Sequence, residues 1–452
     1  MKQMAYVRSN ESGSALLVVM ILVFSMGIVG SAFFSLVGHE IRASHANLNS
    51  QQAFWLAEGA KERAIVYLSN MYSPPTTDFY IYQDMGNMDG GTYTVHCIVD
   101  TTVQWDVEKA FVLDCVGNSG DVERRVRQRV RMTSFALYAM FTNDETIDGN
   151  PIWHITGDLI EGPLHTNGSF SIYGTPQFLG KVTSASDHMT SYPDFRVTEM
   201  SDWPVGGNNP YFAEGGEMKV APIPLPTETV DLRDLSFFGG VYTENKTDIE
   251  LGIMGTDDGI VAPGWLRHKD HSAGPDDWIS VQIASLSNKV FYCNNAIYLK
   301  GILDGELTIS SRKSIRIKDD VTYFASDAQG TPLPGCDDLL GLVAERNIVF
   351  LDNSANRNDL IVNGVLMALN TSIKVQNYDE GSPRGILTIW GGLIQKDRGP
   401  VGMFQGGSVV HGYLKNYHYD PRVTARTPPF FPQTGIYEEM AWEETWDDSD
   451  PF

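Results

Sequence analysis

Two pairs of adjacent aspartates are the residues of this 452-residue chain best suited to acid–base chemistry. They are Asp319-Asp320 and Asp337-Asp338, and paired carboxylates can donate and accept protons at a glycosidic bond. Adjacent residues of a strand face opposite sides, however, and such pairs are common in turns. We therefore expect turn residues here, and a protein that is not an enzyme.

Metal-binding patterns are equally sparse. His165 in HTNG and His411 and His418 in HGYLKNYHYD stand alone, without an HExxH motif or a Cys/His cluster, so we interpret them as polar groups packed in turns. The segment GTDDG at 255–259 could bind calcium through carboxylate and carbonyl oxygens, although it lacks the ligand spacing of an EF-hand. Apart from that calcium, no cofactor is expected.

The four cysteines, Cys97, Cys115, Cys293 and Cys336, are too few and too scattered for a disulfide scaffold. Cys97 and Cys115 lie in adjacent predicted strands, so one disulfide could join them if the chain is exported. Otherwise they are small buried apolar residues.

The charge balance argues against nucleic acid as a partner, because the formal net charge is −23, with 56 acidic and 33 basic residues. A local exception is the segment 124–131. Its alternation places four arginines on one strand face: Arg125, Arg127, Arg129 and Arg131. They form either a face paired with nearby carboxylates or a stripe that docks an acidic neighbouring subunit or a polyanion.

The element that decides the compartment is residues 14–38, which carry no charge. At about 1.5 Å per residue, this helix would span a bilayer core. Lys2 and Arg8 in the preceding leader, against Glu11, place residues 1–13 in the cytoplasm and the bulk outside. A secretory signal cleaved near Gly30-Ser31-Ala32 and an uncleaved anchor are the competing interpretations.

The span continues into a predicted amphipathic helix within 39–72. Its apolar stripe recurs at intervals of three and four: Ala53, Ala57, Ala60, Ala64 and Leu68. Strands predicted at 91–99, 111–116 and 122–132 then give a small antiparallel sheet on which this stripe can be buried. Residues 39–133 should therefore form one helix-on-sheet module.

The N-terminus resembles that of PilX-type minor pilins and related pseudopilins over roughly residues 1–70. The motifs are GSALLV at 13–18, the span, and QAFWLAEGA at 52–60. In that family a prepilin peptidase cuts after the glycine, so the resemblance implies that Gly13 ends the leader and Ser14 begins the mature chain. Major pilins carry a glutamate at the fifth mature position, where this chain has Val18. The departure points to a minor subunit.

Residues 134–434 read as a second, mostly β domain. Its clearest strands are three-residue apolar-x-apolar units between polar turns, at 297–299, 307–309, 315–317, 321–323, 348–350, 360–362 and 387–389. Short strands without helices suit a parallel β-helix, with a β-sandwich as the alternative. The overall class is thus α+β. GPLHTNGSF, DLLGLVAERNIVF, LTIWGGLIQKDRGPVG and GYLKNYHYDPRV also look like a bacterial domain of unknown function. Residues 435–452 should be an acidic flexible tail, or a strap on the arginine strand.

These features predict a non-catalytic minor subunit, acting in a tip, priming or adhesive role, of a type IV pilus or related secretion filament. It would cross the inner (cytoplasmic) membrane once and reach the cell surface if assembled. Its partners would be other pilin-like subunits, a prepilin peptidase and the inner-membrane assembly platform, with a surface or polysaccharide ligand. The alternative is a membrane-anchored extracytoplasmic β-helix protein that binds or cleaves polysaccharide.

Overall fold

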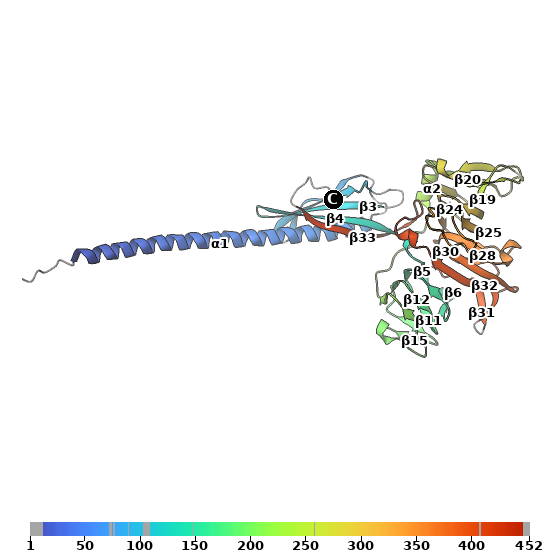
Figure 1. Cartoon of the computed structure of the whole chain (residues 1–452), viewed down its shortest axis with the longest axis horizontal. Helices are drawn as coiled ribbons and strands as arrows, with labels where there is room; N and C mark the ends of the chain where they lie inside the picture. Colours follow the sequence, from blue (N-terminus) through green and yellow to red (C-terminus); the bar gives the residue numbers. More distant parts are fainter. Residues whose placement is uncertain are drawn as a thin grey trace, which may run out of the picture. The chain divides into compact units, whose positions relative to one another are not determined.

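The chain forms two compact units in a computed structural model, which describes residues 12–71, 75, 77–88, 90–102, 109–147, 149–256, 258–405 and 408–445. Unit 1 comprises Met1–Asp100, Phe111–Val130 and Glu439–Phe452, and unit 2 comprises Thr101–Ala110 and Arg131–Glu438. In chain order, unit 2 is therefore inserted into unit 1 (Figure 1). The predicted leader, residues 1–13, lies outside the described residues except for its last two positions.

Unit 1 is one long helix with a five-stranded sheet. Helix α1 is unbroken from Ser12 to Ser69. The sheet order is β1, β2, β3, β4, β33, and the strands are β1 (Phe79–Met88), β2 (Gly91–Val99), β3 (Ala110–Ser119), β4 (Val122–Ser134) and β33 (Gln433–Thr445). The three predicted strands are confirmed as β2, β3 and β4. Strands β1 and β33 were not predicted.

Strand β33 corrects the prediction for the C-terminus. Residues 435–445, expected as part of a flexible tail, complete the sheet beside β4. The strap on the arginine strand, which was the other interpretation, describes this segment. Its acidic side chains reach the basic residues of β4, which gives an isolated acidic segment a reason to be ordered. Residues 446–452 lie outside the described part.

Unit 2 is built from short strands that stack in parallel, as expected for a mostly β domain. The first ladder contains β5 (Met140–Asp144), β10 (Leu164–Thr166), β13 (Val182–Ser184), β17 (Gly216–Met218), β18 (Val241–Thr243), β22 (Val290–Cys293), β24 (Glu306–Ser311), β26 (Leu339–Ala344), β28 (Leu360–Ala368) and β30 (Pro383–Asp397). A second ladder contains β19 (Thr247–Met254), β23 (Ile297–Leu303), β25 (Ile315–Tyr323), β27 (Ile348–Phe350) and β29 (Ile373–Val375). The later parts of β28 and β30 belong to the first ladder, whereas their earlier parts join β25 and β32 (Ser408–Tyr419) in a third.

Smaller elements surround these ladders. Two further ladders consist of β8 (Trp153–Ile155), β11 (Ser171–Tyr173), β14 (Met189–Ser191) and β15 (Phe195–Val197), and of β9 (Leu159–Ile160), β12 (Gln177–Phe178) and β16 (Tyr211–Phe212). The hairpin strands are β6 (Thr146–Ile147), β7 (Asn150–Pro151), β20 (Ile260–Asp270), β21 (Ile279–Gln282) and β31 (Gly402–Gln405), and one short helix is α2 (Val230–Phe237).

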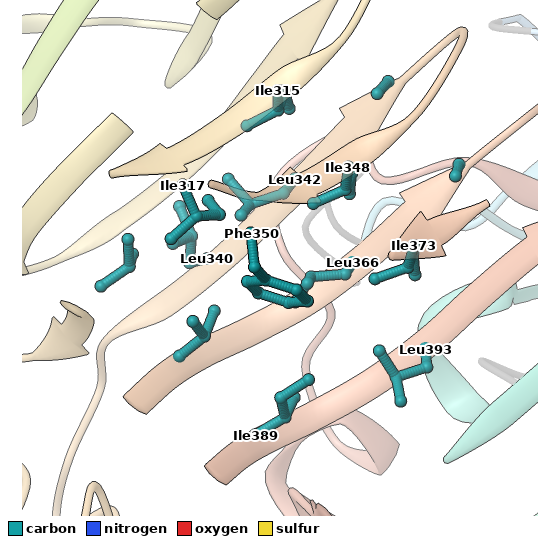
Figure 2. Packing of buried hydrophobic residues seen from close by; sticks show 14 of the residues in the cluster. Ile315, Ile317, Leu340, Leu342, Ile348, Phe350, Leu366, Ile373, Ile389 and Leu393 are labelled. Carbon is teal, nitrogen blue, oxygen red and sulfur yellow. The ribbon is translucent and has the colours of Figure 1, made fainter. Parts of the chain in front are cut away.

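Identical positions of successive strands form apolar columns inside unit 2. Ile315, Ile348 and Ile373 are aligned in the second ladder, and Phe350 lies two residues after Ile348, beside Leu366 of the first ladder (Figure 2). All of them are buried. Parallel stacking of consecutive short strands is the pairing expected of β-helix rungs. A β-sandwich, which is built from antiparallel sheets, does not describe it.

The first ladder also shows how the chain is wound. Its spatial order is β17, β13, β10, β5, β30, β28, β26, β24, β22, β18, so the chain leaves at one end and re-enters at the other. Residues 219–240 make this return. They are held by two hydrogen bonds between Asn167 and the backbone of Ile223, at 2.7 and 2.8 Å, and by Glu345, which accepts from Thr229. The strands before this return, β5 to β17, form the first half of unit 2, and those after it, β18 to β32, form the second half. The two halves meet where β30 pairs with β5.

Candidate assembly helix and polar sites

The first half of α1 exposes its apolar side chains. Leu16, Phe24 and Phe34 are 67%, 65% and 77% exposed, and their apolar neighbours are exposed as well. By length and composition this helix could cross a membrane. An exposed surface of this kind costs free energy in water, so contact with lipid or with another apolar surface would stabilise it.

The second half of α1 packs on the sheet of unit 1 through the predicted stripe. Ala53, Ala57, Ala60, Ala64 and Leu68 are all fully buried. Small side chains let the helix approach the sheet closely, and the approach is tightest at a glycine of β3. A Cβ added to Gly117 would lie 2.0 Å from the Ala53 carbonyl oxygen and 2.7 Å from the Ala57 nitrogen.

The predicted processing and register residues fall at the start of this helix. Gly13 and Ser14 are in its first turn. Val18 is exposed on the next turn. Cleavage between Gly13 and Ser14 remains a prediction, and so does the consequence of valine at position 18. What the structure adds is that the exposed apolar surface begins close behind the predicted cleavage point.

The four arginines of the predicted docking stripe meet carboxylates of this chain. Arg127 Nε lies 3.2 Å from Asp114, and Arg125 Nε lies 3.8 Å from the same carboxylate. Arg129 pairs with Asp100 in unit 1, and Arg131 pairs with Glu438 at 3.0 Å in unit 2. The interpretation as a face paired with nearby carboxylates therefore describes this strand. Docking by the same arginines stays a prediction.

Ion pairs and hydrogen bonds join the unit 1 part of β33 to β4 and to α1. Glu444 accepts hydrogen bonds from Arg124, whose Nη1 also donates to Ser50 Oγ of α1 at 2.6 Å. Trp442 Nε1 donates to Glu58 at 2.7 Å, and Lys61 lies 3.4 Å from Glu439. The C-terminal strand thus binds both the neighbouring strand and the helix.

Cys97 and Cys115 are free thiols in the structure. They share one face of the sheet, but Cys97 lies opposite Leu113 and Cys115 opposite Val95, so they are diagonal neighbours. Diagonal pairs are about 7–8 Å apart at Cα, beyond the usual span of a disulfide. The predicted disulfide is therefore absent from this sheet, and burial raises the pKa of the Cys97 thiol to about 12.

The candidate catalytic aspartates accept hydrogen bonds from backbone amides. Asp338 Oδ1 accepts from Gly305 N at 2.7 Å, and its Oδ2 accepts from Ala325 N at 3.0 Å. Asp320 accepts from Ile361 N at 2.8 Å. Asp337-Asp338 lies just before β26, which matches the interpretation as turn residues, but Asp319-Asp320 lies inside β25, so that prediction is wrong for this pair.

The candidate histidines are packed polar groups, but they lie in strands β10 and β32 and not in turns as predicted. His165 contacts Thr183 at 2.8 Å and Asn167 at 3.0 Å, and burial lowers its pKa. His418 stacks on Trp390 and lies 3.2 Å from Glu161. His411 contacts the Gly381 carbonyl.

The candidate calcium segment is the turn between β19 and β20. Within 255–259, Gly259 N donates to the Thr256 carbonyl at 2.8 Å, and Asp257 lies outside the described residues. Across the described part of the chain, no group of three or more His, Cys, Asp or Glu side chains could hold a metal ion. The calcium therefore stays a prediction.

A buried charged cluster, which no spacing in the sequence indicates, lies where the two halves of unit 2 meet. Arg398, just after β30, donates from Nη1 to Glu145 Oε2 at 2.9 Å and to His154 Nε2 at 3.0 Å. Glu145 also accepts from Thr142 of β5. Exposure of Glu145, His154 and Arg398 is 1%, 0% and 5%, so the cluster is closed to substrates and acts as an internal tie.

Two buried histidines should make unit 2 sensitive to acid. Burial lowers the pKa of His268 from 6.5 to about 4, and burial beside Arg398 lowers the pKa of His154. The unfolded chain therefore binds protons that the folded chain rejects. Stability should be complete above pH 6.5 and decline as the pH falls toward 4, by roughly 3 kcal/mol for His268 alone. Urea unfolding at pH 7.5 and pH 5 measures the larger part of this loss, about 2 kcal/mol.

The matched variants for the acid test are His268→Gln and His45→Gln. His45 is exposed on α1, so His45→Gln should keep the full pH dependence, whereas His268→Gln should reduce it. An equal pH dependence in both variants would contradict the assignment to His268.

Comparison with known proteins gives limited matches. The model of one family, Domain of unknown function (DUF4900), matches residues 108–186. No curated protein matches the sequence. Among solved structures, the competence-associated pilin ComZ from Thermus thermophilus is 13% identical, with 88% of this chain and 97% of that chain covered and a TM-score of 0.31. A likeness at that score carries no argument about fold or function.

Proposed function

We propose that this chain is a membrane-anchored, non-catalytic subunit of a type IV pilus or related filament, present as a minor component. The observation that carries the proposal is helix α1, which is continuous for 58 residues, exposed and apolar in its first half and buried on a sheet in its second. The first half of such a helix can lie in the bilayer before assembly and among neighbouring helices afterwards. Its second half stays packed on the sheet of unit 1.

Processing by a prepilin peptidase is part of this proposal. A short leader precedes Gly13, and the apolar helix surface follows. Cleavage after Gly13 would remove the charged leader and place a new amino group at Ser14, at the start of the apolar helix. The N-terminus of the mature chain would then lie at the edge of the hydrocarbon core.

The minor role rests on Val18. A glutamate at this point would be costly in the bilayer unless it were paired with a neighbouring amino group, and that pairing would register the subunit in the filament. Valine removes both the cost and the pairing. The subunit therefore suits an end of the filament, in a priming, tip or adhesive role, where fewer neighbours must be matched.

N-terminal sequencing of the mature protein tests the proposal. In cells that contain a prepilin peptidase, the wild-type chain should begin at Ser14, and Gly13→Val should retain Met1 and be missing from sheared filaments. The matched control is Gly27→Val in the same helix, because a Cβ there meets nothing within 4 Å. It should be processed normally.

Three results would contradict the proposal. A wild-type chain that begins at Met1 would leave only an uncleaved anchor, and a new N-terminus near residues 31–33 would indicate ordinary secretion. Cleavage of Gly13→Val at the wild-type rate would show that the prepilin peptidase does not recognise Gly13.

A further inference from the structure

Six basic side chains gather on one flank of unit 2, along the second ladder and the corner that precedes it. We call this set the cationic stripe: Arg312, Lys313, Arg316, Arg346, Lys374 and Lys396. The chain as a whole has a net charge of −23, so a cluster of positive charge on this flank is opposite in sign to the rest of the molecule.

The register of the rungs brings these residues together. Arg346 N donates to the Lys313 carbonyl at 2.8 Å, and Lys396 N donates to the carbonyl of Thr371 on the next rung at 3.1 Å. On the adjacent face, Arg316 and Lys374 occupy the same column on either side of Val349. Rungs stack about 4.8 Å apart, so the charges recur along a line.

The stripe differs from the arginines of β4 in its partners. Among the residues that the structure describes, none of the six forms an ion pair, whereas the four arginines of β4 all do. Arg312 donates to Asn294 at 3.3 Å, and the Arg316 guanidinium lies 5.5 Å from the centre of the Tyr298 ring.

Most carboxylates near the cationic stripe already accept hydrogen bonds or form ion pairs. Glu345 accepts two hydrogen bonds from Thr229, and Glu244 accepts from Tyr242 and Asn294. Asp397 follows Lys396 in the chain. Asp248 lies in the same column as Arg316 and pairs with Lys318 and His271. Asp144 lies opposite Asp397. The six cations outnumber these five carboxylates, and Asp248 is already paired.

We propose that the cationic stripe binds an acidic polysaccharide through its carboxylate groups. Arginine presents a planar fork that matches a carboxylate, and lysine adds point charges along the line. The Tyr298 ring stacks on His271, with centroids 4.1 Å apart, and lies under the Arg316 guanidinium, whereas His271 is 40% exposed and offers its outer ring face to a sugar ring. The proposal rests on the proposed function, because an extracytoplasmic unit is the one that meets such polymers.

Nucleic acid fits the stripe less well. A duplex carries one charge per about 1.7 Å of its axis and extends far beyond four rungs, into the field of an acidic protein. One carboxylate per sugar is a sparser charge, which a short stripe can match. The electrostatic part of this binding should weaken as salt is raised.

Binding of the full-length chain in detergent to polygalacturonate tests the proposal, with uncharged dextran and duplex DNA as the other probes. Wild-type protein should bind polygalacturonate, and Lys313→Ala with Arg346→Ala should weaken binding roughly tenfold or more. The matched double variant, Lys181→Ala with Lys219→Ala, removes two cations elsewhere on unit 2 and should bind as wild type. Circular dichroism should show both double variants folded.

The proposal would be overturned by equal losses in the two double variants, by equal binding of dextran, or by tighter binding of DNA than of polygalacturonate. None of these results depends on the N-terminus. Sequencing of the mature chain therefore shows separately whether the filament proposal fails.

Discussion

Glu145→Ala should destabilise unit 2 by about 3–5 kcal/mol, because it leaves the Arg398 guanidinium buried without a counter-charge. Arg398 is 5% exposed and donates to Glu145 Oε2 at 2.9 Å, and water cannot replace that partner without opening the stack. The loss falls where β5 meets β30, so both halves of unit 2 should loosen. Hydrogen exchange of backbone amides, read separately for each unit, measures the effect.

Two variants show whether the missing charge is the cause. Glu145→Leu with Arg398→Met replaces the pair by apolar side chains of similar size and should recover most of the lost stability. Glu217→Ala breaks the exposed pair with Lys181, whose side chains are 57% and 56% exposed, and should cost little. A loss below about 1 kcal/mol for Glu145→Ala would show that the pair contributes little to the meeting of the halves.

Local patterns were enough to predict the helix and its two faces. An uncharged run at 14–38 and alanines at intervals of three and four describe a helix that is exposed first and buried later. The same holds for β2, β3 and β4, whose side chains alternate. These features depend on residues close in sequence, so the chain alone specifies them.

Long-range pairings were beyond such patterns. Strand β33 joins β4 across some 300 residues of sequence, and its acidic side chains looked like a solvated tail until their arginine partners were in place. The meeting of β30 with β5 has the same origin. Each strand shows which face is apolar, but nothing in it names the strand that lies next to it.

The candidate sites show the same limit. The alternation in β4 predicts Arg125 and Arg127 on one face, but Asp114, which pairs with both, comes from another strand. For Cys97 and Cys115, adjacency of strands was predicted and the register was not, although the register decides whether two thiols can meet. A site whose chemistry changes when the strand register shifts by one residue can be recognised only from the folded sheet.

Gly117→Val should destabilise unit 1 by about 3 kcal/mol or more, because its side chain would enter the backbone of α1 and not a flexible side chain. The added Cβ would lie 2.0 Å from the Ala53 carbonyl oxygen, so the helix or β3 has to move. Displacement would expose the alanine stripe, and the helix would lose its attachment to the unit that it carries. Hydrogen exchange over 50–70 and 110–119 should rise.

Gly86→Val is the matched control, because Gly86 lies in β1 of the same sheet and a Cβ there meets nothing within 4 Å. Valine suits a strand, so this variant should keep its stability. If Gly117→Val were as stable as Gly86→Val, the close approach of helix and sheet would not be what holds α1. If only Gly117→Val loses exchange protection and also fails to enter filaments, then the half of α1 that is buried on the sheet is as necessary for assembly as the half that is exposed.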